Sequence, residues 1–197
     1  MTALATSRSD ETRMRLLQGA EQILLEQGVH ALTVRHVGGV SGLNGTLVTY
    51  HFSSIVGLLR ELAHRNLAPM IADWAKLPGP DAPFDAILAA WLHPLLRPAA
   101  FNPDGRALIV LDEIAAHGAA ELSGEVMAAM VATGEAVQHA LAPHLPALDT
   151  TTLRARLRFI AGAALGPPPR LPAPGGPLET LAGFEQLFGF AKAALRG

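Results

Sequence analysis

The chain has 197 residues, of which 50% are hydrophobic, 16% are charged and 5% are aromatic, and its formal net charge is −2. This length allows one large domain or a small domain joined to a larger one, with a sizeable core. The absence of cysteine excludes disulfides, thiolate catalysis and cysteine-ligated zinc. Abundant alanine and leucine favour an all-α fold, because strands prefer β-branched and aromatic side chains.

The N-terminus carries charged residues where a secretory signal would need an apolar run, and no apolar stretch of about 20 residues is free of charges and prolines. We therefore expect a cytoplasmic protein with no membrane span. No HExxH, P-loop or GxSxG pattern is present, so we expect no enzyme and no cofactor. His139 and His144 are five residues apart with Pro143 between them, which is poor geometry for a shared metal, so no metal site is expected.

In chain order, the first helix is expected to begin at a cap supplied by Ser7 or Ser9 and to end before Gly28. Its apolar residues recur at three- and four-residue spacing and form one stripe. Thr33 is placed to cap a short second helix, which is followed by a tight turn at 41–43. The stripe of the first helix contains Leu16, Ala20, Ile23 and Leu24, and the second helix presents Val34, Val37 and Val40 inward.

Asn44 is placed to cap a third short helix that reaches about Tyr50, and Ser53 or Ser54 opens a fourth helix. Two short helices joined by a glycine-containing turn, after a longer helix, describe a helix-turn-helix. Gly42 suits the turn because a positive φ costs glycine little. The sequence therefore predicts a helix-turn-helix DNA-binding domain at 1–65.

The remainder, 66–197, is predicted to form a larger helical domain, and Pro69 is expected to end or kink the fourth helix. The segment 166–177 has six prolines and three glycines in twelve positions and is predicted to be a stiff loop. Further helices are expected near 83–97, 104–118, 121–142, 150–165 and 178–195.

The segment Gly28 to Leu59, GVHALTVRHVGGVSGLNGTLVTYHFSSIVGLL, resembles the DNA-binding domain of the tetracycline-repressor (TetR) family without gaps. The matching features are the glycine after the first helix, Thr33 opening the second, the turn Ser41-Gly42-Leu43-Asn44, the segment Tyr50-His51-Phe52-Ser53-Ser54 and Leu58-Leu59. The resemblance covers about a third of the chain. It implies a dimeric, all-helical, repressor-like protein whose C-terminal domain binds an effector.

The candidate DNA contacts lie on the third helix and at three helix starts. Asn can pair with adenine through two hydrogen bonds, Thr offers a hydroxyl and a methyl group, and free N–H groups at helix starts attract phosphate. Asn44 could instead be a cap alone, and Tyr50 and His51 could be packing residues. No arginine or lysine lies between Arg35 and Arg60, so strong reading of guanine is not expected. The candidates are Thr33, Asn44, Gly45, Thr46, Thr49, Tyr50, His51, Ser53 and Ser54.

In the second domain, an effector pocket is expected to be mostly apolar with a few placed polar groups. Each candidate residue could also be ordinary core or surface. The scarcity of basic groups argues against a highly anionic effector. The pocket candidates are Trp91, His93, Phe101, Asp112, Glu113, His117, Met127 and Met130.

The last two predicted helices carry apolar stripes that could build a four-helix bundle between two subunits, although packing within one subunit is the alternative. A dimer would present two recognition helices about 34 Å apart to successive major grooves. The predicted interface residues are Leu153, Leu157, Ile160, Ala161, Ala164, Leu181, Phe184, Phe188, Ala191 and Leu195.

These observations lead to a hypothesis of a ligand-responsive transcriptional regulator. It would be a repressor that binds a pseudo-palindromic, double-stranded DNA operator as a homodimer and is released by a small apolar or amphipathic effector. The alternative is a helical protein-interaction module with a degenerate helix-turn-helix. The net charge of the whole chain favours this alternative, whereas six arginines against five acidic residues in 1–65 favour DNA binding.

Overall fold

A computed structural model describes residues 2–117, 120–166 and 183–197, apart from the side chains of residues 2–7, 117 and 121. Most of the predicted loop at 166–177, and Leu181 of the predicted interface, lie outside the described residues. The described segments are mainly α-helical, so the all-α prediction is confirmed. The helices are α1 (Thr2–Gln27), η1 (Val29–Ala31), α2 (Val34–Ser41), α3 (Thr46–Phe52), α4 (Ile55–Trp74), α5 (Phe84–Leu95), α6 (Ala107–His117), α7 (Ala120–Leu141), η2 (Ala142–His144), α8 (Thr150–Leu165) and α9 (Phe184–Arg196).

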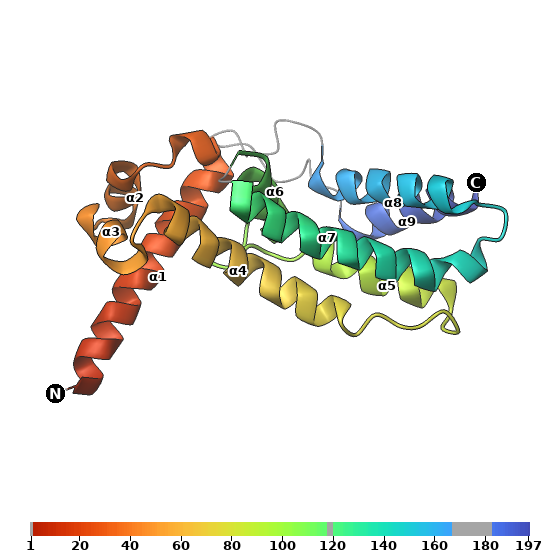
Figure 1. The fold of residues 1–197 in the computed structure, drawn as a ribbon, viewed down its shortest axis with the longest axis horizontal. Coiled ribbons are helices and arrows are strands. Elements are labelled where there is room, and N and C mark those ends of the chain that lie inside the picture. The colour runs from red at the N-terminus through yellow and green to blue at the C-terminus, as the bar shows by residue number, and fades with distance from the viewer. Residues whose placement is uncertain (1, 118–119, 167–182) are drawn as a thin grey trace.

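The molecule is elongated, with α1, α2 and α3 at one end and α8 and α9 toward the other (Figure 1). Helices α4 and α7 run along its length, and α6 lies between the two ends. Helices pack both against their neighbours in the chain and against helices far away in sequence. Helix α4 contacts α5, α6 and α7, and α9 contacts both α5 and α8.

Helix α1 begins at Thr2, so the prediction that Ser7 or Ser9 caps it is wrong. The residues before Ser7 include alanine and leucine, which favour helix and let it extend upstream. The first turns project from the body (Figure 1), and complete burial of α1 side chains begins at Leu16. The predicted end is confirmed, since α1 stops at Gln27 and Gly28 has a φ of 77°.

Side-chain caps set the starts of the next helices largely as predicted. The Thr33 hydroxyl accepts from His36 N at 3.1 Å at the start of α2, and the Ser54 hydroxyl accepts from Gly57 N at 3.0 Å at the start of α4. Asn44 Oδ1 accepts from Thr46 N at 2.9 Å. These bonds satisfy backbone N–H groups that have no partner inside the helix.

Pro69 does not end the fourth helix, because α4 continues from Ile55 to Trp74. The helix keeps going because residues after the proline are buried: Met70 is fully buried and Trp74 is 7% exposed. Their packing outweighs the missing backbone N–H of one proline. Helix α4 also runs through the predicted domain boundary at 65/66, and the division into two domains stays a prediction.

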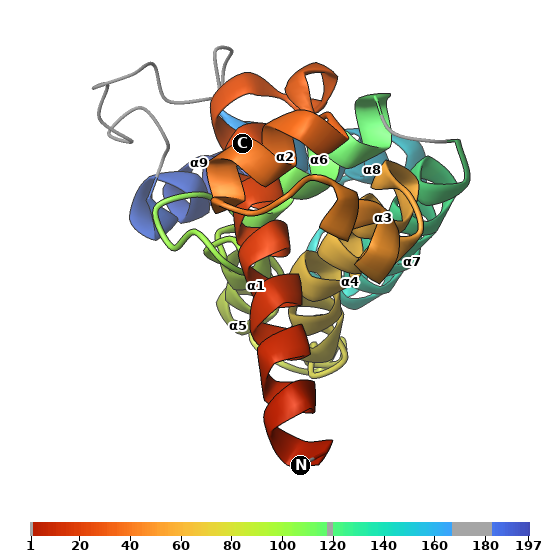
Figure 2. The same cartoon turned by 90° about the vertical axis from the view of Figure 1, so that its left-hand side faces the viewer.

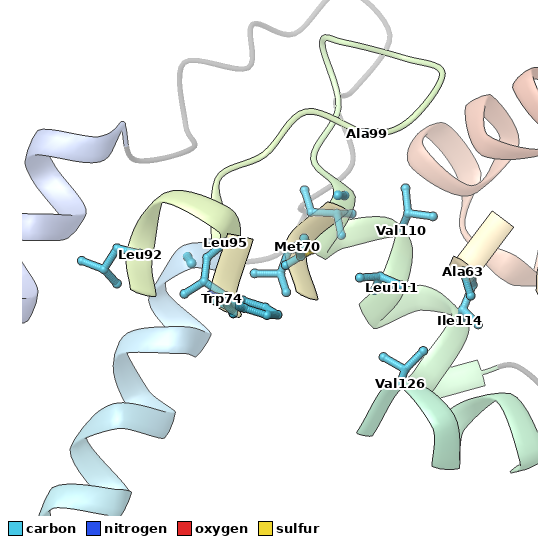
Figure 3. Packing of buried hydrophobic residues seen from close by; sticks show 14 of the residues in the cluster. Ala63, Met70, Trp74, Leu92, Leu95, Ala99, Val110, Leu111, Ile114 and Val126 are labelled. Atoms are coloured by element: carbon cyan, nitrogen blue, oxygen red, sulfur yellow. The ribbon is translucent and has the colours of Figure 1, made fainter. Parts of the chain in front are cut away.

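The core of the larger helical part lies where α4, α5, α6 and α7 meet. Figure 3 shows Met70 and Trp74 of α4 beside Leu95 of α5, with Leu111 and Ile114 of α6 a short way along the same cluster. No helix in the described part of the chain is long and apolar enough to cross a bilayer.

Candidate DNA-binding surface and ligand cavity

Helix α2 and the start of α3 approach closely because each has a glycine at the point of contact. A Cβ atom added to Gly38 would lie 2.6 Å from the backbone nitrogen of Gly45, and one added to Gly45 would lie 2.6 Å from the Val34 carbonyl oxygen. Real Cβ contacts essentially never come this close. Glycine at position 38 lowers the helix propensity of α2, but the packing of the helix-turn-helix requires it.

Two arginines of α1 hold the C-terminal ends of α2 and α3. Arg15 donates to the carbonyl oxygen of Ser41 at 2.8 Å, and Arg13 donates to that of His51 at 2.8 Å while its guanidinium lies 4.6 Å from the centre of the Phe52 ring. Cations at helix C-termini interact favourably with the partial negative charge there. Sequence reasoning missed these roles, because the contacts join residues 26 and 38 positions apart.

Helix α3 has one buried and one exposed face. Val48 and Phe52 are buried, whereas Thr46 and Thr49 are exposed and Tyr50 is 80% exposed. The Tyr50 ring meets the half-buried His51 ring edge-on, with centroids 4.9 Å apart. A large aromatic side chain is thus held outward on a short helix whose opposite face is fixed in the core.

The other predicted contacts lie around this face, at the end of the molecule formed by α2, α3 and the start of α4 (Figure 2). Asn44 Oδ1 accepts from both the backbone N–H and the hydroxyl of Thr46, each at 2.9 Å, although the N-cap position of α3 is Gly45 and not Asn44 as predicted. Ser53 has a φ of 66°, and it is exposed together with Thr33 and Ser54. The exposed members of the predicted set therefore lie on α3 or at the ends of α2, α3 and α4.

Comparison with known proteins finds solved structures that are similar to this chain, but no similar sequence. No protein-family model matches it, and no curated protein matches it. Its structure is similar to that of a TetR-family transcriptional regulator from Rhodococcus sp., with a TM-score of 0.60, 17% identity and coverage of 94% of this chain and 97% of that one. It is also similar to the TetR-family regulator PfmR from Thermus thermophilus, with a TM-score of 0.64, 17% identity and coverage of 93% and 95%.

A third similar structure is the transcriptional regulator SCO7518 from Streptomyces coelicolor A3(2), with a TM-score of 0.52, 19% identity and coverage of 95% of this chain and 99% of that one. The chain has the TetR fold. The coverage extends over the larger helical part as well, so the resemblance that the sequence carried only at 28–59 applies to the whole architecture.

Within the TetR fold, four of the predicted effector residues line one cavity. Trp91, Asp112, Met127 and Met130 surround a hollow of about 700 Å³ between α4, α5, α6, α7 and α8. Trp74 of α4, which sequence reasoning did not select, lines the same hollow. Its volume lies in the range of cavities that bind drug-sized molecules.

The other predicted effector residues lie elsewhere. Exposed His93 stacks on Phe184 with ring centroids 3.9 Å apart, and the half-buried Phe101 packs against the core. Glu113 accepts from the backbone nitrogen of Val29 at 3.1 Å, so it joins α6 to η1. The side chain of His117 lies outside the described residues. In the described segments, no three potential ligand side chains form a metal-binding group.

A second, more open hollow of about 820 Å³ lies along α4 and includes His51 and Ser53. Its two arginines face acidic residues, since Arg13 lies 4.0 Å from Glu61 and Arg60 lies 4.0 Å from Glu125. The charges of this hollow are thus largely compensated by the chain itself.

The predicted interface stripes of α8 and α9 face inward. In α8, Leu153, Leu157, Ile160 and Ala164 are buried, and Ala161 is half-buried at the cavity. In α9, Ala191 and Leu195 are buried, while Phe184 and Phe188 pack partly buried against the core. The large apolar side chains exposed on these two helices are instead Phe159, at 72%, and Phe190, at 50%.

Proposed function

We propose that the protein is a DNA-binding transcriptional regulator whose α3 enters the major groove. The observation that carries this proposal is the exposed face of α3, where Thr49 and the 80%-exposed Tyr50 project from a helix fixed by Val48 and Phe52. A recognition helix must be rigid and must present its side chains to base edges. The fold shared with the TetR-family regulators supports the same function.

Tyr50 and Thr49 are the proposed base-reading residues. The Asn44 side chain is already bonded to Thr46, and pairing of Asn44 with adenine through both its oxygen and its nitrogen would compete with those bonds. The remaining predicted residues would bind the phosphate backbone. Thr33 and Ser54 are exposed at helix starts, where backbone N–H groups and the helix dipole attract anions, and the exposed Ser53 directly precedes Ser54.

The DNA-binding proposal is tested by selecting a preferred site from a library of random duplexes and measuring affinity for that site. Tyr50→Ala is expected to weaken binding about tenfold, because a lost base contact costs about 1–3 kcal/mol. Gln22→Ala, which changes an exposed side chain on α1 outside the proposed contacts, should bind like the wild type. Affinity should also fall steeply with salt. Enrichment of no sequence would contradict the proposal and favour the interaction module.

We further propose that two copies pair through the exposed faces of α8 and α9. Phe159 and Phe190 lie on those faces, and a Cβ added to Gly162 would meet nothing within 4 Å, so the outer side of α8 has room for a close neighbour. The buried stripe then stabilises each subunit, and the exposed phenylalanines stabilise the dimer. Such pairing would set two α3 helices for successive grooves of an operator.

Sedimentation of the full chain tests the dimer. We expect a dimer at micromolar concentration, and Phe159→Glu should shift it toward monomer, because a buried unpaired charge in an apolar contact is costly. Ile71→Glu is the matched control, since Ile71 is 44% exposed but lies on α4. A monomeric wild type, or a dimer that tolerates Phe159→Glu, would contradict the proposed interface.

The cavity between α4, α5, α6, α7 and α8 is the proposed effector site. Its floor includes Trp74, the last residue of α4, and α4 begins beside α3. A ligand that binds better when α4 is displaced would favour the form that does not bind DNA. This supports a repressor that a small molecule releases from its operator.

A further inference from the structure

Part of the effector cavity presents aromatic and sulfur-containing surface. Trp74 and Trp91 both line it, and Trp74 Nε1 donates to the carbonyl oxygen of Trp91 at 3.0 Å, so this indole N–H is already used inside the protein. Met127 and Met130 line the cavity from α7. Indole faces and thioethers interact favourably with aromatic rings, which points to an aromatic ligand body.

Two positively charged side chains line the cavity without a negatively charged partner in the described part of the chain. Arg154 and Arg158 lie one turn apart on α8, and both line the cavity and are exposed. Arg154 donates through Nε to the neutral amide oxygen of Gln138 at 3.2 Å. Neither arginine forms an ion pair with any residue in the part of the chain that the structure describes.

Two acidic residues also line the cavity, but neither cancels this pair of cations. Asp112 of α6 already has a partner within the chain. Glu135 of α7 forms no ion pair with either arginine in the described segments. Two like charges one helical turn apart repel each other, so a bound anion would relieve their repulsion.

We propose that the cavity binds an aromatic monoanion, namely a ring system that carries one carboxylate or sulfonate. The rings would lie against Trp74 and Trp91, and the anionic group would accept hydrogen bonds from Arg154 and Arg158. Guanidinium groups bind carboxylates and sulfonates through paired N–H donors. This inference rests on the proposed function of the cavity as the effector site and names the chemical class of that effector.

The test uses two dyes that differ by one sulfonate group: 1-anilinonaphthalene-8-sulfonate and its uncharged parent, N-phenyl-1-naphthylamine. The chain has two tryptophans, and both line the cavity. Dye bound there should therefore emit when tryptophan is excited, and Trp91→Phe should lower this sensitised emission. Titration of the full-length wild type should show the sulfonate binding more tightly than the uncharged dye.

The arginine variants separate charge recognition from apolar binding. Arg154→Ala and Arg158→Ala should each weaken binding of the sulfonate about three- to tenfold, because each removes a charged hydrogen bond at a partly solvated site. They should change binding of the uncharged dye by less than about twofold. Arg35→Ala, an exposed arginine on α2, should change neither. Both side chains on α8 are exposed, so unchanged melting temperatures of the variants should show that the fold is intact.

Equal affinity for the two dyes, or equal losses of both dyes in the arginine variants, would overturn the proposal. Operator binding is measured in parallel, with and without the sulfonate. A charge-dependent ligand that leaves DNA affinity unchanged would support the proposed ligand class and contradict the effector role. If the protein binds DNA normally but the cavity shows no preference for the charged dye, the proposed ligand class is contradicted and the DNA-binding function still holds.

Discussion

A fully buried carboxylate joins three parts of the fold, and its removal gives the sharpest test of how they are held together. Glu21 of α1 is 0% exposed. Its Oε1 accepts from Asn66 Nδ2 at 2.8 Å and from Ala100 N at 3.2 Å. Its Oε2 accepts from Phe101 N at 2.7 Å and from Asn102 Nδ2 at 2.9 Å. Helix α1, helix α4 and the segment between α5 and α6 therefore meet at one side chain.

The variant Glu21→Gln keeps the shape of this side chain and turns one acceptor oxygen into a donor. In either orientation the new NH₂ group faces two N–H donors. The less damaging orientation places it at the Oε1 position, because Ala100 N also donates to Asn66 Oδ1 at 3.1 Å and keeps that bond. Asn66 then loses an acceptor, and the remaining bonds lose their charge. Hydrogen bonds to charged groups contribute about 1.5–3 kcal/mol each, so we expect destabilisation of about 2–4 kcal/mol.

Urea unfolding at fixed protein concentration measures this change through the shift of the transition midpoint. The control is Glu26→Gln on the same helix, where an exposed carboxylate accepts from Gln22 at 2.9 Å. The control should change stability by less than about 0.5 kcal/mol, as exposed substitutions usually do. If Glu21→Gln costs no more than Glu26→Gln, the carboxylate network does not stabilise the fold as argued.

Two further predictions concern single positions. Gly38→Ala should destabilise the protein by at least about 2 kcal/mol, because its methyl group meets the backbone of Gly45. Gly39→Ala should stabilise α2 by roughly 0.5–1 kcal/mol, because nothing lies within 4 Å of its Cβ position. Urea unfolding of both variants measures the two changes, and similar effects would refute the close approach. Hydrogen bonds from the backbone and hydroxyl of Thr152 lower the pKa of Asp149 below its usual 3.8, so its cap on α8 should stabilise the protein above that pH and be lost as the pH falls through the lowered pKa. The melting temperature of the wild type relative to Asp149→Asn should fall on acidification, and a constant difference would contradict the assignment.

The helices nearest the N-terminus could be predicted well because their signals are local. A capping side chain acts within three residues of its own position, and a glycine ends a helix through its own φ angle. Thr33, Ser54 and Gly28 therefore have in the structure the roles that the sequence indicates. The predicted start of α1 was wrong because helix propensity upstream outweighed the local signal, and α4 does not end at Pro69 because packing downstream outweighed the proline.

The candidate DNA contacts could be proposed from the sequence as a set, and they stay a prediction. The contacts that support their helices could not be proposed in this way. Arg13 and Arg15 hold the ends of α3 and α2 from a helix far away in sequence, and an arginine at a helix surface carries no local sign of such a role. The same limit applies to Glu21, whose donors come from residues 45 to 81 positions away.

Periodicity in α8 identified an apolar stripe but could not say what covers it. Leu153, Leu157 and Ile160 recur at helical spacing whether their partner is the same subunit or another. The exposed Phe159 is out of phase with this stripe, and a periodic pattern does not single it out. Only the three-dimensional packing separates the face used within the subunit from the face left outside.

Helix α4 connects the two proposed sites by its length alone. Its 20 residues extend about 30 Å, from the exposed cap at Ser54 beside α3 to Trp74 at the cavity. Near its middle, Asn66 is bonded to Glu21 of α1 and, through Ala100, to the segment that precedes α6. A ligand that displaces Trp74 therefore acts on a helix that is also fastened to α1, which holds the ends of α2 and α3. In the proposed regulator, the Glu21 contacts would make these helices move together, and a ligand could release DNA only as far as its affinity differs between their two arrangements.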